Sequence, residues 1–411
     1  MASLSDQLKA LGVRLGAKEL SVPTKPPFVP LEKIIDGAYF ENPFGHIYCV
    51  DKIFSSNYCQ GVIELIPFPF SQTLANWIND SRWLDIHPSK VIFIDIETSG
   101  LYHSSGNFAF LIGIGRFVPE GFHLTQIFMD DPGQEQALLI HLSSLVEDYQ
   151  GLVSFNGKSF DIPLLSSRYA LIGEKSNFGE MPHFDLLPLT RRLWRNSLSS
   201  KSLNSLEINV LKFIRTAEDV PGWYVPELYR EFLIHKDAQP LKGVFYHNAM
   251  DILSMAAIYS CISGILHASK SSMIQHNVDL ASLAKLYEDL MDFETAIRLY
   301  ASNISDVPDE QRKEILLRWS LLEKRQRNYS QAVALWKWAA QLGEIYAMVE
   351  LAKFYEHNQK DYEEAIRWVE IAMDAINNCK SYVINQQELK LALAHRCSRL
   401  RHKLSKRRST V

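Results

Sequence analysis

The sequence has few cysteines, and their arrangement does not suit a structural metal site. The five cysteines lie far apart, at positions 49, 59, 261, 379 and 397, and no two of them form a CxxC pair. An odd and scattered set of thiols is typical of a protein in a reducing compartment, and it argues against a zinc site. We therefore expect a cytoplasmic protein.

The sequence also lacks long apolar runs and an excess of basic residues. It contains no stretch of eighteen uninterrupted apolar residues, so no membrane span is expected. Residues 1–8 contain no basic region followed by an apolar core, which excludes a secretory signal. The formal net charge is −4, so overall charge does not indicate nucleic-acid binding. The length of 411 residues predicts about two or three globular domains.

A pair of carboxylates ends an apolar run early in the chain. Residues 91–94 are Val-Ile-Phe-Ile, which predicts a strand in the interior of a sheet, and Asp95, Ile96 and Glu97 follow. Asp95 and Glu97 would share one face, because side chains two apart in a strand point the same way. Their repulsion would be relieved by a bound cation. Alone, however, this pattern is better explained as a strand end that leads into a solvated turn.

Further carboxylates occur in two later segments. Asn156 and Gly157 form a turn after a short strand at 152–155, and Asp161 stands where a helix could begin. His247 and Asp251 are four residues apart in a helical stretch, so they share one helical face. Singly, Asp161 would be a helix cap and the other two a surface pair. Their occurrence together, in this order, is much harder to explain by local structure alone.

The combination of Asp95-x-Glu97, Asn156…Phe160-Asp161 and His247-x-x-x-Asp251 resembles the three exonuclease motifs of the DEDD superfamily. The chain is similar to the bacterial YprB-like family of exonucleases predicted from sequence, in which such a domain precedes tetratricopeptide repeats. The resemblance covers about residues 86–265. The middle motif also resembles the second exonuclease motif of B-family DNA polymerases. The implied fold is an α/β ribonuclease-H-like domain, with a mixed central sheet and flanking helices, followed by an all-α repeat domain.

The resemblance implies a 3'-5' exonuclease that hydrolyses phosphodiester bonds of single-stranded DNA or RNA with two Mg²⁺ or Mn²⁺ ions. The implied metal ligands, which are also catalytic carboxylates, are Asp95, Glu97, Asp161 and Asp251. The residue that we expect to act as general base is His247, a choice that rests on helix geometry rather than on the resemblance. The implied contacts to the substrate come from Thr98, Gly100, Asn156, Phe160 and Tyr246.

The identity of the proton acceptor stays open between two neighbours. The histidine subclass of the superfamily usually places His five residues before the last Asp, and the tyrosine subclass places Tyr four before it. Here Tyr246 is five residues before Asp251 and His247 is four before. The same-face spacing and the near-neutral pKa of imidazole favour His247.

Changes in composition divide the chain into four predicted segments. Residues 1–85 form an N-terminal extension, with a proline-rich linker at 21–30 and a small β element. This element is interpreted as an extension of the main sheet rather than a substrate-guiding lobe. Residues 86–268 form the exonuclease domain. Residues 275–378 form the helical repeats, and residues 379–411 form a C-terminal helix with a basic run that we interpret as a solvated tail.

The repeats are marked by a recurring aromatic-x-x-Ala pattern. It occurs at Phe293–Ala296, Tyr329–Ala332 and Tyr362–Ala365, at spacings of 36 and 33 residues. A period near 34 resembles tetratricopeptide repeats. The pattern predicts antiparallel helix pairs with these aromatic and alanine side chains buried between them.

A rival hypothesis from another class is a catalytically inactive scaffold. Its α/β domain would only bind nucleic acid, and its repeats would recruit a protein partner. The presence of all four carboxylates beside a histidine argues against it, because clustered acids destabilise a fold unless metals offset them. The sequence leaves open DNA or RNA, exonuclease or endonuclease action, and the partner of the repeats.

Overall fold

The computed structural model describes residues 29–100, 106–267, 278–305, 307–378 and 386–408. Contacts within it divide the chain into two compact units. The first unit holds the described residues up to Leu187 and those from Ser202 to His267, and the second holds Pro188–Lys201 with the described residues after His267. Segment 188–201, assigned to the exonuclease domain from sequence, thus groups with the later helices. Most of the predicted proline-rich linker lies outside the described residues.

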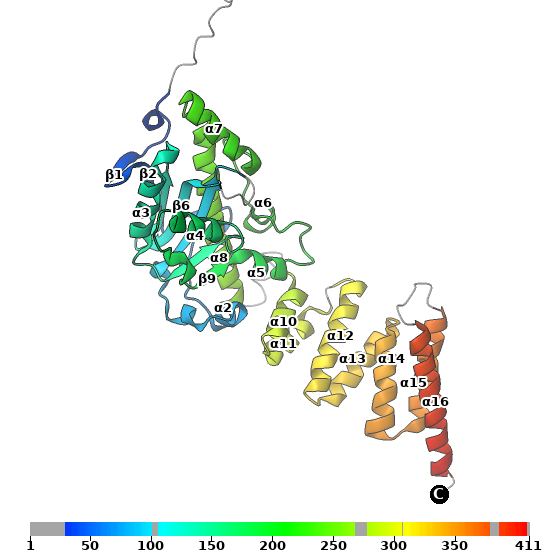
Figure 1. Cartoon of the computed structure of the whole chain (residues 1–411). Coiled ribbons are helices and arrows are strands. Elements are labelled where there is room, and N and C mark those ends of the chain that lie inside the picture. Colours follow the sequence, from blue (N-terminus) through cyan, green and yellow to red (C-terminus); the bar gives the residue numbers. More distant parts are fainter. Residues whose placement is uncertain (1–28, 101–105, 268–277, 306, 379–385, 409–411) are drawn as a thin grey trace, which may run out of the picture. The chain divides into compact units, whose positions relative to one another are not determined.

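The first unit is built on a seven-stranded sheet with the strand order β1-β2-β7-β6-β5-β8-β9 (Figure 1). Its strands are β1 (Ala38–Asn42), β2 (Gly45–Ser55), β5 (Val91–Thr98), β6 (Ala109–Val118), β7 (Gly121–Phe128), β8 (Gly151–Ser154) and β9 (His183–Asp185). β5 pairs antiparallel with β6 and parallel with β8, and β8 pairs parallel with β9. This mixed central sheet confirms the predicted fold class.

The N-terminal strands mostly extend the main sheet. β2 pairs with β7 from Tyr48 to Ser55, and buried Tyr48 donates a hydrogen bond to the Ile35 carbonyl at 2.7 Å. The short strands β3 (Cys59–Gln60) and β4 (Ile63–Glu64) pair with each other in a separate two-stranded sheet. The predicted small β element is therefore divided between the main sheet and this ladder.

The two faces of β5 pack against different helices. Ile92, Ile94 and Ile96 lie on one face, in a hydrophobic core shared with α3 (Glu135–Val146) and α4 (Asp161–Leu171). Phe93 points to the other face, where its ring centroid is 5.7 Å from that of Tyr259 in α8 (Leu241–His267). Asp95 and Glu97 follow Phe93 at even spacing, so they share its face. The face that carries the carboxylates is therefore the one that α8 covers.

Shorter helices complete the first unit. They are α2 (Gln72–Ile78), α6 (Leu203–Leu206), α7 (Val225–His235), the π-helical turn η7 (Glu207–Leu211), and the 3-10 turns η2 (Leu31–Lys33), η3 (Ser81–Asp85), η4 (Pro88–Lys90), η5 (Pro132–Gln134), η6 (Asn177–Gly179) and η8 (Gly222–Tyr224). α5 (Leu186–Leu193) begins in this unit, and its residues from Pro188 onward group with the second.

Helix α8 is long and apolar enough to cross a membrane by length and composition. However, 72% of its most apolar window is buried inside the protein. It also carries Asn248 and Ser254, which are polar and fully buried. These features mark α8 as the central core helix of the domain.

The second unit consists of helices joined by turns, and its described residues contain no strand. Its helices are α10 (Leu280–Asp289), α11 (Phe293–Asn303), α12 (Asp309–Arg325), α13 (Tyr329–Gln341), α14 (Ile345–Phe354), α15 (Tyr362–Asn378) and α16 (Gln386–Arg408), with the π-helical turn η9 (Tyr355–Gln359). Consecutive helices pack in pairs, α10 with α11, α12 with α13, and α14 with α15.

The repeat pattern is buried at its alanines but not at its aromatic residues. Ala296, Ala332 and Ala365 are fully buried. The aromatic partners are only partly buried, which contradicts the prediction; they are Phe293, Tyr329 and Tyr362. Two of these rings lie under cations, with Arg325 4.9 Å from the ring of Phe293 and Lys403 5.8 Å from that of Tyr362. An aromatic face can stabilise a cation at the surface, so these rings need not be buried.

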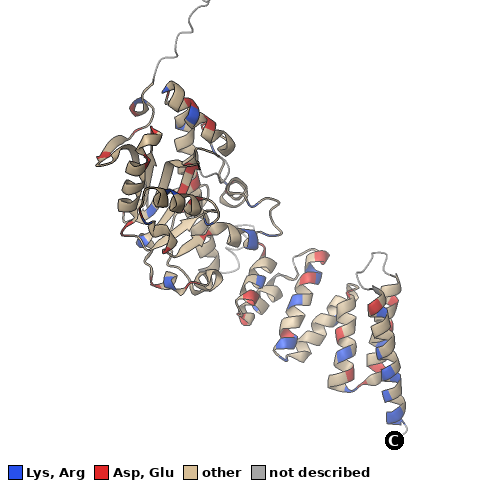
Figure 2. Cartoon of the chain, in the orientation of Figure 1, with Lys and Arg blue, Asp and Glu red and all other residues tan. Residues whose placement is uncertain are grey.

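The basic run near the chain's end is not a solvated tail, contrary to expectation. α16 buries Leu393, Cys397 and Leu400 in a core shared with α14 and α15. Its basic side chains also pair with acids of the preceding helices, and Figure 2 shows the Lys and Arg residues along it. The helix is therefore an integral part of the second unit.

One buried acid, Glu356, forms ion pairs with basic residues of α16. The side chain of Glu356 has no exposed surface, and Arg396, Arg399 and Lys403 donate hydrogen bonds to it at 2.5 to 2.9 Å. Burial alone would raise the pKa of Glu356, but the hydrogen bonds from Lys403 and Arg399 lower it to about 2. Glu356 is therefore ionised and fixes α16 on the unit.

Candidate active site

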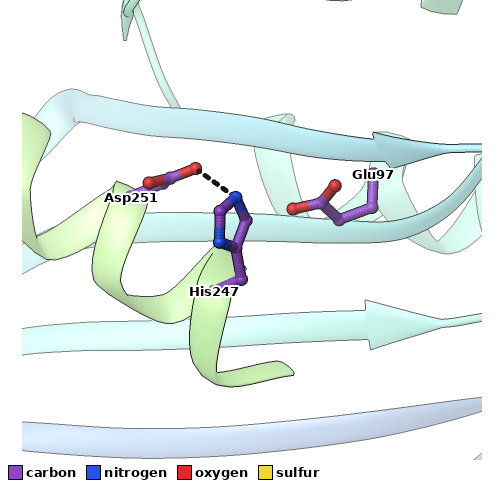
Figure 3. Close-up of side chains that lie close together, drawn as sticks. All are labelled: Glu97, His247 and Asp251. Carbon is purple, nitrogen blue, oxygen red and sulfur yellow. Dashed lines mark ion pairs between the residues drawn. The ribbon is translucent and has the colours of Figure 1, made fainter. Parts of the chain in front are cut away.

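Three elements of the first unit bring the predicted site residues together. Asp95 and Glu97 come from β5, Asp161 begins α4, and His247 and Asp251 come from α8. One possible ligand atom from each of Glu97, His247 and Asp251 lies within 4.8 Å of the others (Figure 3). These three residues form a group that could hold a metal ion, and Asp95 and Asp161 are close enough to act on them electrostatically.

Burial and mutual repulsion act on the carboxylates of the site. Burial is the main cause that raises the pKa of Glu97 to about 8, and the charges of Asp251 and Asp161 add to it, while His247 and Arg215 oppose it. Burial, with the charges of Asp185 and Asp251, raises the pKa of Asp161 to about 7.

Asp95 lies in the same repulsive field. Burial, followed by the charges of Asp251, Glu97 and Asp161, holds its pKa well above the usual range. A group of carboxyls in this state binds either protons or cations when it is folded.

The structure places His247, and not its neighbour Tyr246, beside the carboxylates. His247 Nε2 is 3.6 Å from Asp251 Oδ2, and Nδ1 is 2.8 Å from Asp219 Oδ1. The Tyr246 hydroxyl instead accepts a hydrogen bond from the Thr216 backbone N–H at 3.0 Å. Neighbouring helical residues diverge by about 100°, so only one of the two can face the site.

Asp161 depends on a tightly held loop after β8. Asp185 accepts backbone N–H bonds from Asn156 at 2.8 Å and from Lys158 at 3.2 Å, besides one from Leu187 at 3.0 Å at the start of α5. A Cβ at Gly157 would lie 2.5 Å from Ser154 Oγ and 2.9 Å from Asp161 Oδ2, so a side chain there would crowd both residues. Asp185 therefore does more than cap a helix, because it fixes the loop that carries Asp161.

Asp95 is oriented by two amides that the sequence patterns did not indicate. Asn248 donates to Asp95 Oδ2 at 2.9 Å and accepts a hydrogen bond from Gln126 at 2.9 Å. Gln126 also donates to the Phe245 carbonyl at 2.9 Å. Gly113 makes this arrangement possible, since a Cβ there would lie 2.3 Å from Asn248 Oδ1.

Asp251 is braced by Arg215, which the sequence reasoning also missed. Arg215 forms ion pairs with Asp251 and with Glu207, the latter at 2.6 Å. Glu207 is fully buried and accepts a hydrogen bond from Ser254 at 2.6 Å, and Ser254 accepts one from Gln60 of β3 at 3.1 Å. A buried polar chain therefore connects the β3–β4 ladder to the site. It has no sequence signal, because its members come from separate segments.

The predicted substrate contacts lie at the borders of the site. The Thr98 hydroxyl donates to the Gly100 carbonyl at 2.8 Å and so closes the turn after β5, next to residues outside the described part. Asn156 has a left-handed backbone, with φ of 68°. Phe160 directly precedes Asp161 and exposes 46% of its surface. Contact of these residues with a substrate stays a prediction.

Comparison with known proteins agrees with this architecture. Residues 92–263 match the family model described as RNase_H superfamily. A protein of Bacillus subtilis (strain 168), designated Uncharacterized protein YprB, is 30% identical over 370 residues, which cover 82% of this chain and 88% of that protein. The chain belongs to the YprB family. The first unit is accordingly the RNase H-like domain of a YprB-family protein.

A solved structure matches part of this YprB-family chain. The family B DNA polymerase from the hyperthermophilic archaeon Pyrobaculum calidifontis matches 52% of it at 15% identity, with a TM-score of 0.32. The match spans only 29% of that polymerase.

Proposed function

We propose that this YprB-family protein is a metal-dependent nuclease, and specifically a 3'-5' exonuclease acting on single-stranded nucleic acid. The observation that carries the proposal is the meeting of four carboxylates and His247 on the covered face of an RNase H-like sheet. Burial raises the pKa of three of these acids, so their proximity opposes folding at neutral pH. A scaffold that only bound nucleic acid would have no use for this arrangement.

The donor set fits a hard divalent cation. It consists of carboxylate oxygens with one imidazole, which suits Mg²⁺ or Mn²⁺ better than a thiolate-preferring metal. Asp95, Glu97, Asp161 and Asp251 would hold two such ions. Bound there, the ions would lower the pKa of a water and stabilise the attacking and leaving oxygens of a phosphodiester.

His247 is arranged to accept a proton. His247 Nδ1 lies 2.8 Å from Asp219 Oδ1 and 3.2 Å from a guanidinium nitrogen of Arg215. In the tautomer that carries its proton on Nδ1 and donates it to Asp219, Nε2, on the side of Glu97 and Asp251, is the acceptor. Burial lowers the pKa of His247, but the charges of Asp251 and Glu97 and the Asp219 hydrogen bond outweigh burial and raise it. The exposed Phe160 ring would stack on a base, and Asn156, Thr98 and Gly100 would orient the strand end.

A single pair of measurements tests this function. Mn²⁺ or Mg²⁺ added to metal-free protein should raise the melting temperature, because ligands that bind only the folded state stabilise it. The same ions should support stepwise shortening of 5'-labelled single-stranded DNA or RNA from the 3' end. Asp95→Ala should remove both effects. Cleavage that survives in Asp95→Ala with excess chelator would contradict the mechanism, and binding without cleavage by the native chain would favour the scaffold.

A further inference from the structure

Two apolar side chains stand out on the surface of the first unit. Ile214 and Trp223 expose 78% and 70% of their surface, more than any other large apolar side chain in the described part of the chain. Both lie in residues 212–224, which we call the rim loop and which run from the end of η7 to η8. An exposed tryptophan contributes little to folding, so its position needs another explanation.

The rim loop is anchored to the candidate active site at several points. Arg215, next to Ile214, pairs with Asp251, and Asp219 is bonded to His247. A Cβ at Gly222 would lie 3.4 Å from His247 Nε2, and Trp223 is the next residue along the chain. Consecutive Cα atoms are about 3.8 Å apart, so the backbone of Trp223 borders the site.

The rim loop carries no net positive charge to attract a phosphate backbone. It holds two basic residues, Lys212 and Arg215, and two acidic ones, Glu218 and Asp219, and the site beside it is a cluster of acids. Apolar contact is therefore what this border offers to a strand. Aromatic faces stack on bases of any sequence, and unpaired bases are the only ones free to do so. The ring of Trp223 lies against that of Tyr224, with the centroids 5.5 Å apart and an interplanar angle of 50°, and most of the Trp223 surface is open to solvent.

We propose that Trp223 is a stacking platform for an unpaired base of the strand that enters the site. The inference rests on the proposed nuclease function and deepens it, because it names a residue outside the predicted site that would hold an unpaired base. Phe160 directly precedes Asp161, and the proposed function already gives its ring a stacking role. Trp223 adds a second platform on the His247 side.

Strand binding is measured with the native full-length chain as the parent and with Ca²⁺ in place of Mg²⁺, because Ca²⁺ takes the same oxygen ligands in a looser geometry that is less suited to cleavage. The probes are 5'-fluorescent single-stranded DNA and RNA oligonucleotides, and anisotropy gives the dissociation constant. Trp223→Ala should weaken binding roughly 5- to 150-fold, the range that the loss of one stacked base produces. Trp223→Phe should recover most of the affinity. Phe44→Ala is the matched control, since Phe44 is also an exposed aromatic residue, with 45% of its surface open. It lies in the turn between β1 and β2, which is none of the site's elements, so this variant should bind like the parent.

The outcomes separate this inference from the function on which it rests. Equal affinity of Trp223→Ala and the parent for single strands overturns the stacking role alone. Failure of the parent to bind either nucleic acid overturns the proposed function as well. Light scattering tests whether Trp223 instead contacts a second copy of the protein. If the parent self-associates and Trp223→Ala does not, Trp223 is a protein contact and the inference is wrong.

Discussion

The two ring nitrogens of His247 face two different carboxylates. Asp219 fixes Nδ1 at 2.8 Å, and Nε2 lies 3.6 Å from Asp251. The Tyr246 hydroxyl instead accepts a hydrogen bond from the Thr216 backbone N–H. The ring that can exchange a proton with a water in the site is therefore the imidazole.

Replacing His247 by alanine should lower the turnover number by about 10²–10⁴-fold, the usual contribution of a general base. The Mn²⁺-induced rise in melting temperature should persist, because the four carboxylates remain. Tyr246→Phe keeps the packed ring and loses one hydrogen-bond acceptor, so turnover should change little. A larger loss of turnover in Tyr246→Phe than in His247→Ala would assign the site to the tyrosine subclass.

Glu97 makes the stability of the metal-free protein depend on pH. Its folded pKa of about 8 is above the ordinary value of 4.5, so the folded state binds more protons than the unfolded state between these values. The free energy of unfolding should therefore fall as pH rises toward and through about 8, by on the order of 1 kcal/mol from pH 7 to 9. Denaturant titrations in chelator should show this fall.

Glu97→Gln is the control for this pH effect, because an amide does not titrate. The variant should lose a large part of the fall between pH 7 and 9, and Mn²⁺ should flatten the native profile in the same window. His183 and His141 do not interfere, because burial lowers their pKa values and both are neutral in this range. A native profile that is flat or rises from pH 7 to 9 would show that the carboxyls are not coupled as described.

The residues found by sequence reasoning are those with a local signal. The motifs place Asp95, Glu97 and Asp161 next to turns and strand ends, where spacing can be interpreted. Asn248 has no such signal, because its partner Asp95 is 153 positions away. The same holds for Gln60 and Ser254, 194 positions apart. Hydrogen bonds over such separations exist only once the fold has brought the segments together.

At the level of elements, α16 shows why a charge run alone is ambiguous. A basic helix can point its charges to water or toward a buried acid, and the composition of residues 396–408 is the same in both cases. Glu356 decides the outcome, and it lies in the helical turn before α15 rather than in the run itself. The main sheet could be predicted with more success. The run of apolar residues in a strand such as β5 is itself the evidence that the strand is buried.

Replacing Glu356 by glutamine should destabilise the helical unit by about 1–3 kcal/mol, the cost of losing hydrogen bonds to a charged group. The substitution leaves Arg396, Arg399 and Lys403 without their shared counterion, but these side chains are partly exposed, so the cost stays below that of a fully buried unpaired charge. The matched control is Glu363→Gln, which removes an exposed pair with Arg408 and should cost well under about 1 kcal/mol. Urea unfolding followed by helical circular dichroism measures both. Equal small effects would mean that α16 is held by its apolar face alone.

On the scale of the whole molecule, the two units are interleaved along the chain. Segment 188–201 belongs to the second unit, where Leu193 accepts a backbone hydrogen bond from Asp279 at 3.2 Å and Asn196 donates to the Asp279 carboxylate at 2.6 Å. Arg192 also pairs with Asp289. A cut between the units at His267 therefore removes partners from residues that precede the site helix.

Ending the chain after His267 should preserve metal binding and cleavage, since all predicted site residues precede that point. The shortened protein should nevertheless be less stable than one ending after Asn303, which keeps Asp279 and Asp289 opposite segment 188–201. Melting temperatures of the two proteins, with and without Mn²⁺, provide the measurement. Complete loss of the Mn²⁺ response in the shorter chain would show that the helical unit contributes to the site itself.

The late position of α8 determines when the site can exist during synthesis. A ribosome releases β5, with Asp95 and Glu97, and then Asp161, well before residues 241–267. Until α8 emerges, this face of the nascent sheet is open to water, where neighbouring carboxylates are solvated and their repulsion is weak. The arrival of α8 supplies Asp251 and His247 and seals the face in the same event. A growing chain therefore acquires its charge cluster and the means to capture cations together, as the last step in completing the domain.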